Sequence, residues 1–99
     1  MPKSSTVSLE ADVSRAIREI VVALGGYALK NKPGAGSAYK GWPDLTLVLP
    51  NGVTAYVEVK RPGKSPTALQ GWWLKELRKL GHRAFAIHSV EEFRQEVLR

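Results

Sequence analysis

Two short apolar runs joined by a tight turn constrain this chain more than any other feature. The runs cover residues 44–49 and 53–60, and the turn between them reads Pro-Asn-Gly at 50–52. Proline fixes a backbone angle that suits the start of a turn, and glycine tolerates the left-handed conformation that a hairpin loop requires. The pattern therefore predicts a β-hairpin whose side chains alternate between the two faces of a sheet.

One face of this hairpin carries charges that are unusual next to a core. Asp44 begins the first run, and Glu58 and Lys60 end the second. A two-residue turn would set Leu45 opposite Glu58, whereas a three-residue loop sets Asp44 opposite Glu58. The Pro-Asn-Gly chemistry favours the three-residue loop, so we expect both carboxylates and the lysine on one face. Such charges are costly near a core unless they are paired, hydrated or bound to a metal, and a hard-metal site would use all three.

The remaining sequence predicts three helices and two further strands around the hairpin. Apolar residues recur at helical spacing in three segments, and short β-prone segments lie between them. The expected helices run from about 8 to 24, from 65 to 80 and from 89 onward, and the expected strands cover 27–30 and 83–87. Residues 31–43 form the longest irregular segment, and loops of this kind often carry function.

Capping residues and apolar stripes define these helices further. The expected N-caps are Ser8, Ser65 followed by Pro66, and Ser89 in a capping box with Glu92. The residues expected to face the core are apolar and recur at helical spacing: Leu9, Val13, Ile17, Ile20, Val21 and Leu24, then Leu69, Trp73, Leu77 and Leu80, and finally Phe93 and Val97.

The order of these elements indicates an α/β fold in a single domain that spans residues 1–99, with residues 1–7 as a loose tail. The order is α-β-β-β-α-β-α. A strand, a helix and another strand after the hairpin imply a right-handed crossover and a parallel pair of strands. We therefore expect a mixed sheet flanked by helices.

Composition narrows the classes of function. The chain has no cysteine, which excludes disulfides and thiolate metal sites. No apolar run approaches the roughly 20 residues that span a bilayer, and the N-terminal residues lack the apolar centre of a signal peptide. We expect a cytoplasmic protein with no membrane partner. The net charge of +6 favours a polyanionic partner such as nucleic acid, although ordinary solubility charge is the alternative.

The charged residues together resemble the PD-(D/E)xK nuclease signature. The segment Gly-Trp-Pro-Asp at 41–44 supplies the first acid, and Glu-Val-Lys at 58–60 supplies the second acid and the lysine. Glu10 and Gln70, on the flanking helices, match additional polar positions of that pattern. Over about residues 8–90 the chain is most similar to the VRR-NUC family (virus-type replication-repair nucleases), including its small stand-alone phage and bacterial members. Such proteins have a restriction-endonuclease-like core, in agreement with the expected fold.

The resemblance implies hydrolysis of DNA phosphodiester bonds with Mg²⁺ or Mn²⁺. Asp44, Glu58 and the main-chain carbonyl of Val59 would bind the metal. Glu10 would bind a second metal or hold a metal-bound water. Lys60 would orient the attacking water or steady charge on the phosphate, and the side chain of Gln70 would orient Lys60 or a water. Stand-alone members are similar to Holliday-junction resolvases, so the resemblance also implies branched DNA as the substrate and a homodimer as the active form.

Simpler interpretations exist for each of these residues. Glu10 could serve only as a favourable charge at a helix N-terminus, Lys60 could form a salt bridge, and Gln70 could be a solvated helix residue. The whole chain could be a non-catalytic, basic nucleic-acid-binding domain whose carboxylates form structural ion pairs. It could also be a protein-interaction module that uses the hairpin and an exposed Trp72.

A set of basic and polar residues surrounds the proposed site in sequence. These residues are candidates for contacts with nucleic-acid phosphates, or else they form a solvated loop face. They are Lys30, Lys32, Ser37, Lys40, Arg61 and Lys64. Tyr39 could stack on an exposed base, whereas Trp42 is expected to pack under the loop.

Overall fold

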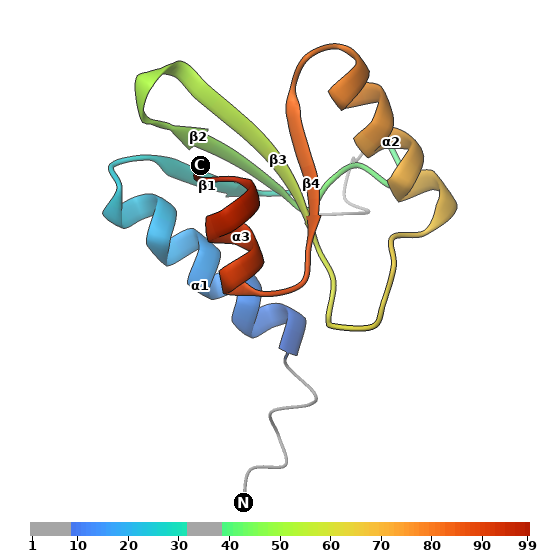
Figure 1. The fold of residues 1–99 in the computed structure, drawn as a ribbon, viewed down its shortest axis with the longest axis horizontal. Coiled ribbons are helices and arrows are strands. Elements are labelled where there is room, and N and C mark those ends of the chain that lie inside the picture. The colour runs from blue at the N-terminus through green and yellow to red at the C-terminus, as the bar shows by residue number, and fades with distance from the viewer. Residues whose placement is uncertain (1–8, 32–38) are drawn as a thin grey trace, which may run out of the picture.

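A computed structural model describes residues 9–31 and 39–99, which form a four-stranded sheet with helices on both faces (Figure 1). The elements in chain order are α1 (Leu9–Ala23), β1 (Tyr27–Lys30), β2 (Leu45–Leu49), a 3-10 turn (Pro50–Gly52), β3 (Val53–Val59), α2 (Ala68–Lys79), β4 (Arg83–Ile87) and α3 (Val90–Glu96). The predicted order α-β-β-β-α-β-α is confirmed.

The sheet is mixed, as predicted. Its strands follow the chain, in the order β1-β2-β3-β4. The first two pairs are antiparallel, and β3 pairs with β4 in parallel after the chain crosses over through α2. A parallel pair requires such a long connection, whereas the antiparallel β2–β3 pair is closed by the short turn.

The register of the β2–β3 hairpin confirms the three-residue loop. Leu49 pairs with Val53, and the ladder continues to Leu45 opposite Val57. One step further along the same register, the position of Asp44 lies opposite that of Glu58. Asn51 and Gly52 take the two left-handed backbone conformations of the loop, with φ of 65° and 74°. Asparagine and glycine are the residues that adopt this conformation most readily, so the local sequence determines the register.

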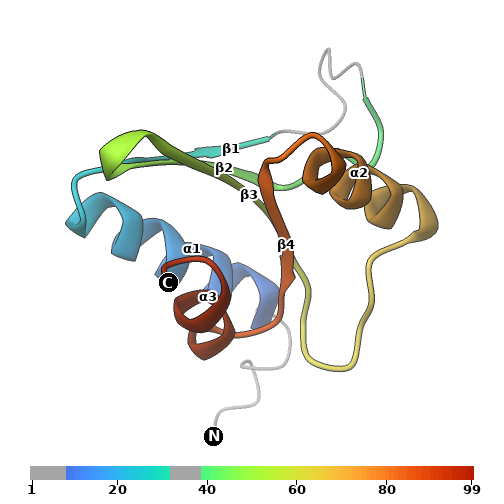
Figure 2. The ribbon, with the colours of Figure 1, turned by 45° about the horizontal axis from the view of Figure 1, so that its top comes forward.

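The two faces of the sheet have separate apolar clusters. Figure 2 shows α1 and α3 together on one face of the sheet, with α2 on the opposite side of β4. The cluster under α1 and α3 contains the buried residues Ile17, Val21, Leu45, Leu47, Leu49, Ala55, Val57, Val59, Ile87, Phe93 and Val97. The cluster under α2 contains Leu74, Leu77 and Ala84, with Trp42, Tyr56 and Ala86 packed against them.

The predicted start of α2 was wrong. The N-cap is Thr67 rather than Ser65, and the helix begins at Ala68. Thr67 forms a complete capping box with Gln70: its hydroxyl accepts the Gln70 N–H at 3.2 Å, and the Gln70 side chain accepts the Thr67 N–H at 2.8 Å. Two satisfied N–H groups favour this start over a cap at Ser65 followed by Pro66.

The predicted buried stripe of α2 was also wrong in part. Leu69 and Leu80 are exposed, and Leu74 is buried in their place together with Leu77. Only the side of the helix that carries Leu74 and Leu77 meets the sheet, and Leu80 lies beyond the last helical residue. Trp73 is half-buried.

The other helices agree with the sequence except at their ends. α1 ends at Ala23, so Leu24 lies beyond the helix and is exposed, and its expected cap, Ser8, lies outside the described residues. The Ser89 hydroxyl caps α3 by accepting the Glu92 N–H at 3.0 Å. The Glu92 carboxylate does not complete a box with Ser89, because it accepts the N–H of His88 instead.

Candidate active site

The predicted acids lie where the β2–β3 ladder ends. The last ladder pair is Leu45 with Val57, and Pro43, two residues earlier, has no N–H to extend it. The side chain of Asp44 continues the contact, because its Oδ2 accepts the Val59 N–H at 3.1 Å. Its main-chain carbonyl accepts the Asn31 N–H, just after β1, at 2.7 Å. Asp44 is therefore held from both sides.

The carboxyl group of Glu58 is buried and only partly compensated. Its side chain is 4% exposed, and Oε1 has no hydrogen-bond partner among the described residues. Burial and the negative charge of Asp44 raise the pKa of Glu58 to about 8, and the positive charge of Lys60 offsets this only in part. A carboxyl group that served only a structural ion pair would have both oxygens satisfied, because an unpaired buried polar atom is costly.

Lys60 lies beside Glu58 at the end of β3. Its Nζ is 3.8 Å from Glu58 Oε2, and its side chain is 17% exposed. This separation is longer than a hydrogen bond, so the pair places the two charges together without using up their hydrogen-bonding capacity. The ammonium group therefore keeps donors for a ligand that enters the site.

The main-chain carbonyl of Val59 points toward the same region as Asp44. In a trans peptide, the carbonyl group and the following N–H point in opposite directions. The N–H of Lys60 donates to the Ile87 carbonyl in β4 at 3.0 Å. The Val59 carbonyl consequently points away from β4, toward the side of β3 on which Asp44 lies.

Glu10, at the start of α1, lies close to the end of β3 although it is far away in sequence. Its Oε2 accepts the Arg61 N–H at 3.2 Å. An open pocket of about 360 Å³ lies between these elements and is lined by Glu10, Ala11, Ser14, Lys30, Asp44 and Val59. Within the described ranges, however, no three acidic or histidine side chains come together as a group that could hold a metal ion. Glu10 shares a pocket with Asp44, and its role as a metal ligand stays a prediction.

Gln70 has a structural role that the sequence interpretation did not include. Its side-chain oxygen completes the capping box at the start of α2. In the described part of the chain, neither hydrogen bond of this box involves Lys60. Its predicted part in orienting Lys60 or a water therefore stays a prediction.

The basic residues lie in three places around the site. Lys30 lines the pocket, whereas Arg61 and Lys64 lie in the exposed segment between β3 and α2. Lys40 is exposed, and its main-chain carbonyl accepts a hydrogen bond from the indole of Trp73 at 2.9 Å. The remaining two candidates, Lys32 and Ser37, lie outside the described residues.

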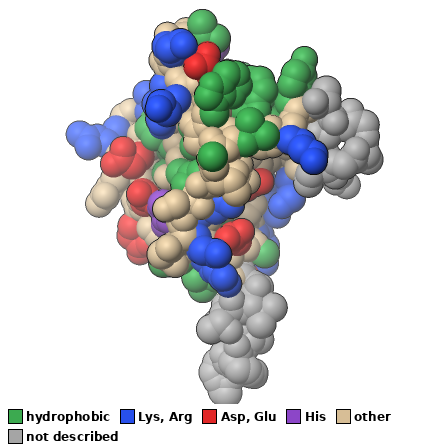
Figure 3. All heavy atoms as spheres, turned by 90° about the vertical axis from the view of Figure 1, so that its right-hand side faces the viewer, with side chains coloured by type: hydrophobic (Ala, Val, Ile, Leu, Met, Phe, Trp, Pro, Cys, Tyr) green, Lys and Arg blue, Asp and Glu red, His purple; other side chains and the backbone are tan. Residues whose placement is uncertain are grey.

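Aromatic rings pack edge-to-face along the α2 side of the site. Trp42 packs against Trp73 and Tyr56, with ring centroids 5.0 and 5.7 Å away, as expected for a residue under the loop. Tyr39 meets Trp73 at 5.6 Å and remains 61% exposed. Trp72 is half exposed, and hydrophobic side chains gather in the upper part of this face of the molecule (Figure 3).

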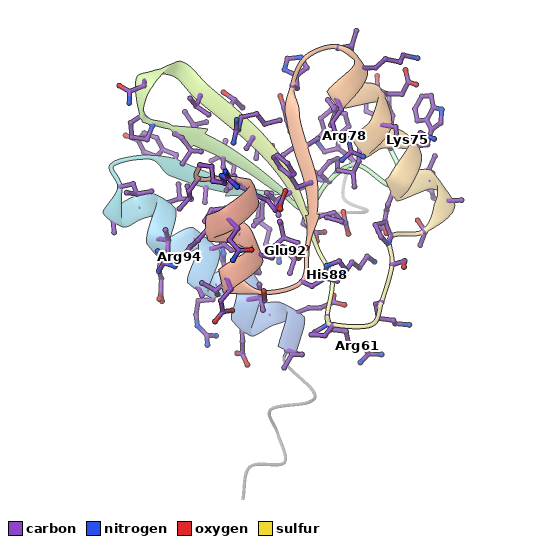
Figure 4. All side chains as sticks on the ribbon, in the orientation of Figure 1. Arg61, Lys75, Arg78, His88, Glu92 and Arg94 are labelled. Carbon is purple, nitrogen blue, oxygen red and sulfur yellow. The ribbon has the colours of Figure 1, made fainter. Side chains whose placement is uncertain are left out.

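Two features of the site were missed from the sequence. His88 follows β4 and lies beside Glu92 (Figure 4); its Nδ1 is 3.0 Å from the Glu92 carboxylate, and its Nε2 is 2.9 Å from the Lys64 carbonyl. It therefore links α3 to the segment that carries Arg61 and Lys64. The second feature is Ser14, whose hydroxyl is buried beside the pocket. The sequence could have indicated this, because Ser14 lies one helical turn after Glu10, on the side of α1 that carries the apolar stripe.

The mixed sheet, the flanking helices and the two acids with a lysine at the end of the hairpin define a domain of the PD-(D/E)xK nuclease class. Residues 3–91 match the model of a protein family described as "VRR-NUC domain". The chain is 36% identical over 85 residues to a protein named "Putative nuclease p44" of Acyrthosiphon pisum secondary endosymbiont phage 1, covering 85% of this chain and 83% of that protein. A solved structure described as "VRR_NUC domain" is 31% identical in sequence to this chain, with a TM-score of 0.78. The match covers 91% of this chain and 95% of the chain in that structure.

This chain belongs to the VRR-NUC family, as its charged residues predicted. It is therefore a member of a nuclease family. In the residues that the structure describes, no helix is long and apolar enough to cross a membrane.

Proposed function

We propose that this chain is a metal-dependent endonuclease that hydrolyses DNA phosphodiester bonds at the site formed by Asp44, Glu58 and Lys60. The buried Glu58 carboxyl group is the observation that carries this proposal. One of its oxygens has no hydrogen-bond partner among the described residues, and the negative charge of Asp44 lies nearby. A bound cation would satisfy the oxygen and relieve the repulsion between the two carboxylates.

The donor atoms present fit Mg²⁺ or Mn²⁺. Hard cations take oxygen ligands, and Mg²⁺ typically binds one or two carboxylates together with waters and substrate phosphates. Asp44, Glu58 and the Val59 carbonyl would hold it, and Glu10 would act from the other side of the pocket. When bound, such a cation neutralises charge on the phosphate and lowers the pKa of a water molecule.

Lys60 is the group on the protein that is best suited to act on the phosphate or the attacking water. Its ammonium group lies beside Glu58, is mostly buried, and is not consumed by a close hydrogen bond to that carboxylate. A fixed positive charge in a partly dry site stabilises developing negative charge more strongly than the same charge would in water. Lys30, Arg61 and Lys64 are exposed around the site and would contact the DNA backbone.

We further propose that the substrate is branched DNA, such as a Holliday junction, and that the enzyme acts as a homodimer in the cytoplasm. The similarity to stand-alone nucleases of this family supports branched DNA. Symmetric cutting of two strands requires two sites, and a two-fold dimer of this chain would supply them. The exposed Trp72, with Leu69 one turn before it on α2, offers apolar surface for such an interface.

Cleavage of defined DNA substrates tests the proposal. Wild type would be assayed on duplex, forked and four-way junction DNA with Mg²⁺, with Mn²⁺ and with EDTA, beside Asp44→Asn and Lys60→Ala. We expect metal-dependent cleavage by wild type and a loss of activity of about a hundredfold or more for each variant. Asp44→Asn removes a negative charge that would hold the metal, and Lys60→Ala removes the positive charge that would stabilise the transition state. Matched controls are Glu19→Gln and Lys79→Ala, both exposed and away from the site.

The outcomes separate the possible functions. Wild type that binds DNA but cuts none of these substrates with either metal would leave a non-catalytic binding domain. Full activity of Asp44→Asn and Lys60→Ala would show that cleavage takes place at another site. A monomer in light scattering that still cuts paired strands would rule out the dimer.

A further inference from the structure

The segment between β3 and α2 begins with a tight turn that has a basic residue at each end. The turn reads Arg-Pro-Gly-Lys at residues 61–64. The Lys64 N–H donates to the Arg61 carbonyl at 3.1 Å, and Gly63 has a φ of 85°. Proline at the second position and a glycine of positive φ at the third are typical of a type II turn. The local sequence therefore fixes the shape of the turn, whereas its orientation depends on what holds its two ends.

Both ends of this turn are held by side chains from distant parts of the chain. At the first end, the Arg61 N–H donates to Glu10 Oε2 at 3.2 Å. At the other end, the Lys64 carbonyl lies 2.9 Å from Nε2 of His88, which follows β4. The Arg61 and Lys64 side chains are exposed. The His88 ring therefore connects an exposed, basic turn to the end of the sheet.

The other side of the His88 ring is oriented by α3. Nδ1 is 3.0 Å from Glu92 Oε1, the same oxygen that accepts the His88 main-chain N–H (Figure 4). A carbonyl and an ionised carboxylate only accept hydrogen bonds. The Lys64 contact is therefore a hydrogen bond when Nε2 carries a hydrogen, and the doubly protonated ring donates to both neighbours.

We propose that His88 is a positioning residue for DNA binding, an inference that rests on the proposed contact of Arg61 and Lys64 with the DNA backbone. By holding the Lys64 carbonyl, its ring sets the direction in which the turn presents these two cations. Contacts with phosphates fix the register of a protein on DNA, and a turn that must first be ordered gives up part of the binding free energy. The charge that contacts DNA and the group that orients it thus lie on different elements.

Two substitutions of similar shape separate the two ring nitrogens. The amide nitrogen of asparagine lies near the position of Nδ1 and does not reach Lys64, whereas that of glutamine lies near the position of Nε2. Both variants keep the main-chain N–H that Glu92 accepts. With Ca²⁺ in place of the catalytic metal, we expect His88→Asn to bind forked DNA about threefold to tenfold more weakly than wild type, and His88→Gln to bind within about twofold of it. Fluorescence anisotropy measures both affinities.

Cleavage kinetics give a second measurement of the same loss. Contacts with the DNA backbone away from the reacting phosphate bind substrate and transition state alike, so their loss raises KM and leaves kcat unchanged. We expect this pattern for His88→Asn with saturating Mg²⁺ or Mn²⁺. A fall in kcat at unchanged KM would contradict a role in DNA positioning.

A double-mutant cycle tests whether His88 acts through the turn. Lys64→Ala removes the ammonium group and keeps the main-chain carbonyl that His88 contacts. In a background of Arg61→Ala and Lys64→Ala, His88→Asn should weaken binding by less than about twofold, because the cations it orients are absent. In the matched background of Lys30→Ala, which removes a cation from β1, the full loss should remain.

The binding measurements decide between positioning of the turn and simple packing of the ring. Wild-type affinity in His88→Asn, equal weakening in both variants, or an undiminished loss without the two cations would each overturn the inference. If His88→Asn does not fold, His88→Gln decides alone, and binding more than about threefold weaker than wild type overturns it. Wild type that binds DNA but cuts none would end the proposed nuclease function and leave the role of His88 to the affinities. Wild type that binds no DNA would end both.

Discussion

The face of the sheet covered by α1 and α3 differs in composition from the face covered by α2. Beneath α1 and α3 the buried side chains form one continuous apolar cluster that reaches from Ile17 to Val97. Beneath α2 the buried apolar residues are Leu74, Leu77 and Ala84, and aromatic rings pack around them. Glu58 and Lys60 belong to the α2 face by strand alternation, at the end where β2 and β3 separate.

This difference indicates how the domain combines stability with chemistry. The α1–α3 face supplies a continuous core that fixes the sheet. The α2 face does not need every strand position for packing, so it can hold a buried carboxyl group with an unsatisfied oxygen. Glu10 and Ser14 reach the same end of the sheet from α1, so the site lies where the two faces meet.

Matched leucine substitutions, one on each face of the sheet, should give the largest difference in the free energy of unfolding. Leu47 is fully buried in the α1–α3 cluster, whereas Leu77 lies in the small cluster under α2. We expect Leu47→Ala to lower the free energy of unfolding by about 4–5 kcal/mol and Leu77→Ala by about 2–3 kcal/mol, because the cost of a cavity depends on its surroundings. Urea denaturation measures both, and equal losses would contradict a division between a stabilising and a functional face.

The pH dependence of stability without metal tests the charge on the α2 face. Burial and Asp44 raise the pKa of Glu58 from 4.5 to about 8, so between these values the folded protein binds more protons than the unfolded chain. The contribution of Glu58 to the free energy of unfolding is therefore most favourable below pH 4.5, and it weakens as the pH rises toward about 8.

Urea unfolding of wild type and Glu58→Gln in EDTA at pH 5, 6.5 and 8 measures this contribution. The other titrating groups are shared, so the difference between the two proteins reports Glu58 together with its coupling to Asp44 and Lys60. We expect the variant to gain stability relative to wild type as the pH rises. Parallel pH profiles would show that the Glu58 carboxyl group is not strained by its surroundings.

The smallest expected effect concerns the basic residues at the edge of the site and is measured by the salt dependence of DNA binding. Arg61 and Lys64 lie in the exposed segment between β3 and α2, and Arg94 lies away from Arg61 on α3 (Figure 4). With Ca²⁺ in place of the catalytic metal to prevent cleavage, Arg61→Ala or Lys64→Ala should reduce the slope of log K against log salt concentration by about one unit. Fluorescence anisotropy would measure the slope, and Arg94→Ala should leave it unchanged. If Arg61→Ala and Lys64→Ala kept the wild-type slope, these two residues would not contact the DNA backbone.

The hairpin and its register could be predicted because their determinants are local. The turn chemistry at Asn51 and Gly52 fixes the loop length, and strand alternation then sets Asp44 opposite Glu58. The order of the elements and the mixed sheet follow from the same kind of short-range pattern.

The features that were missed depend on contacts between distant parts of the chain. The buried side of α2 is decided by where that helix meets β4, so Leu74 could not be distinguished from Leu69 by spacing alone. The bond from Arg61 to Glu10 joins residues 51 positions apart. The burial of Ser14 likewise depends on how α1 packs against the sheet rather than on its neighbours in sequence.

Metal binding to the isolated protein tests the central claim most directly. Isothermal titration calorimetry with Mn²⁺ at pH 8 would compare wild type with Glu58→Gln, which keeps the size of the side chain and removes its charge. We predict saturable binding by wild type and at least a tenfold weaker association for Glu58→Gln, with Glu19→Gln unchanged. Wild-type affinity in Glu58→Gln would contradict the assignment of the buried carboxyl group on the α2 face as the centre of a metal site.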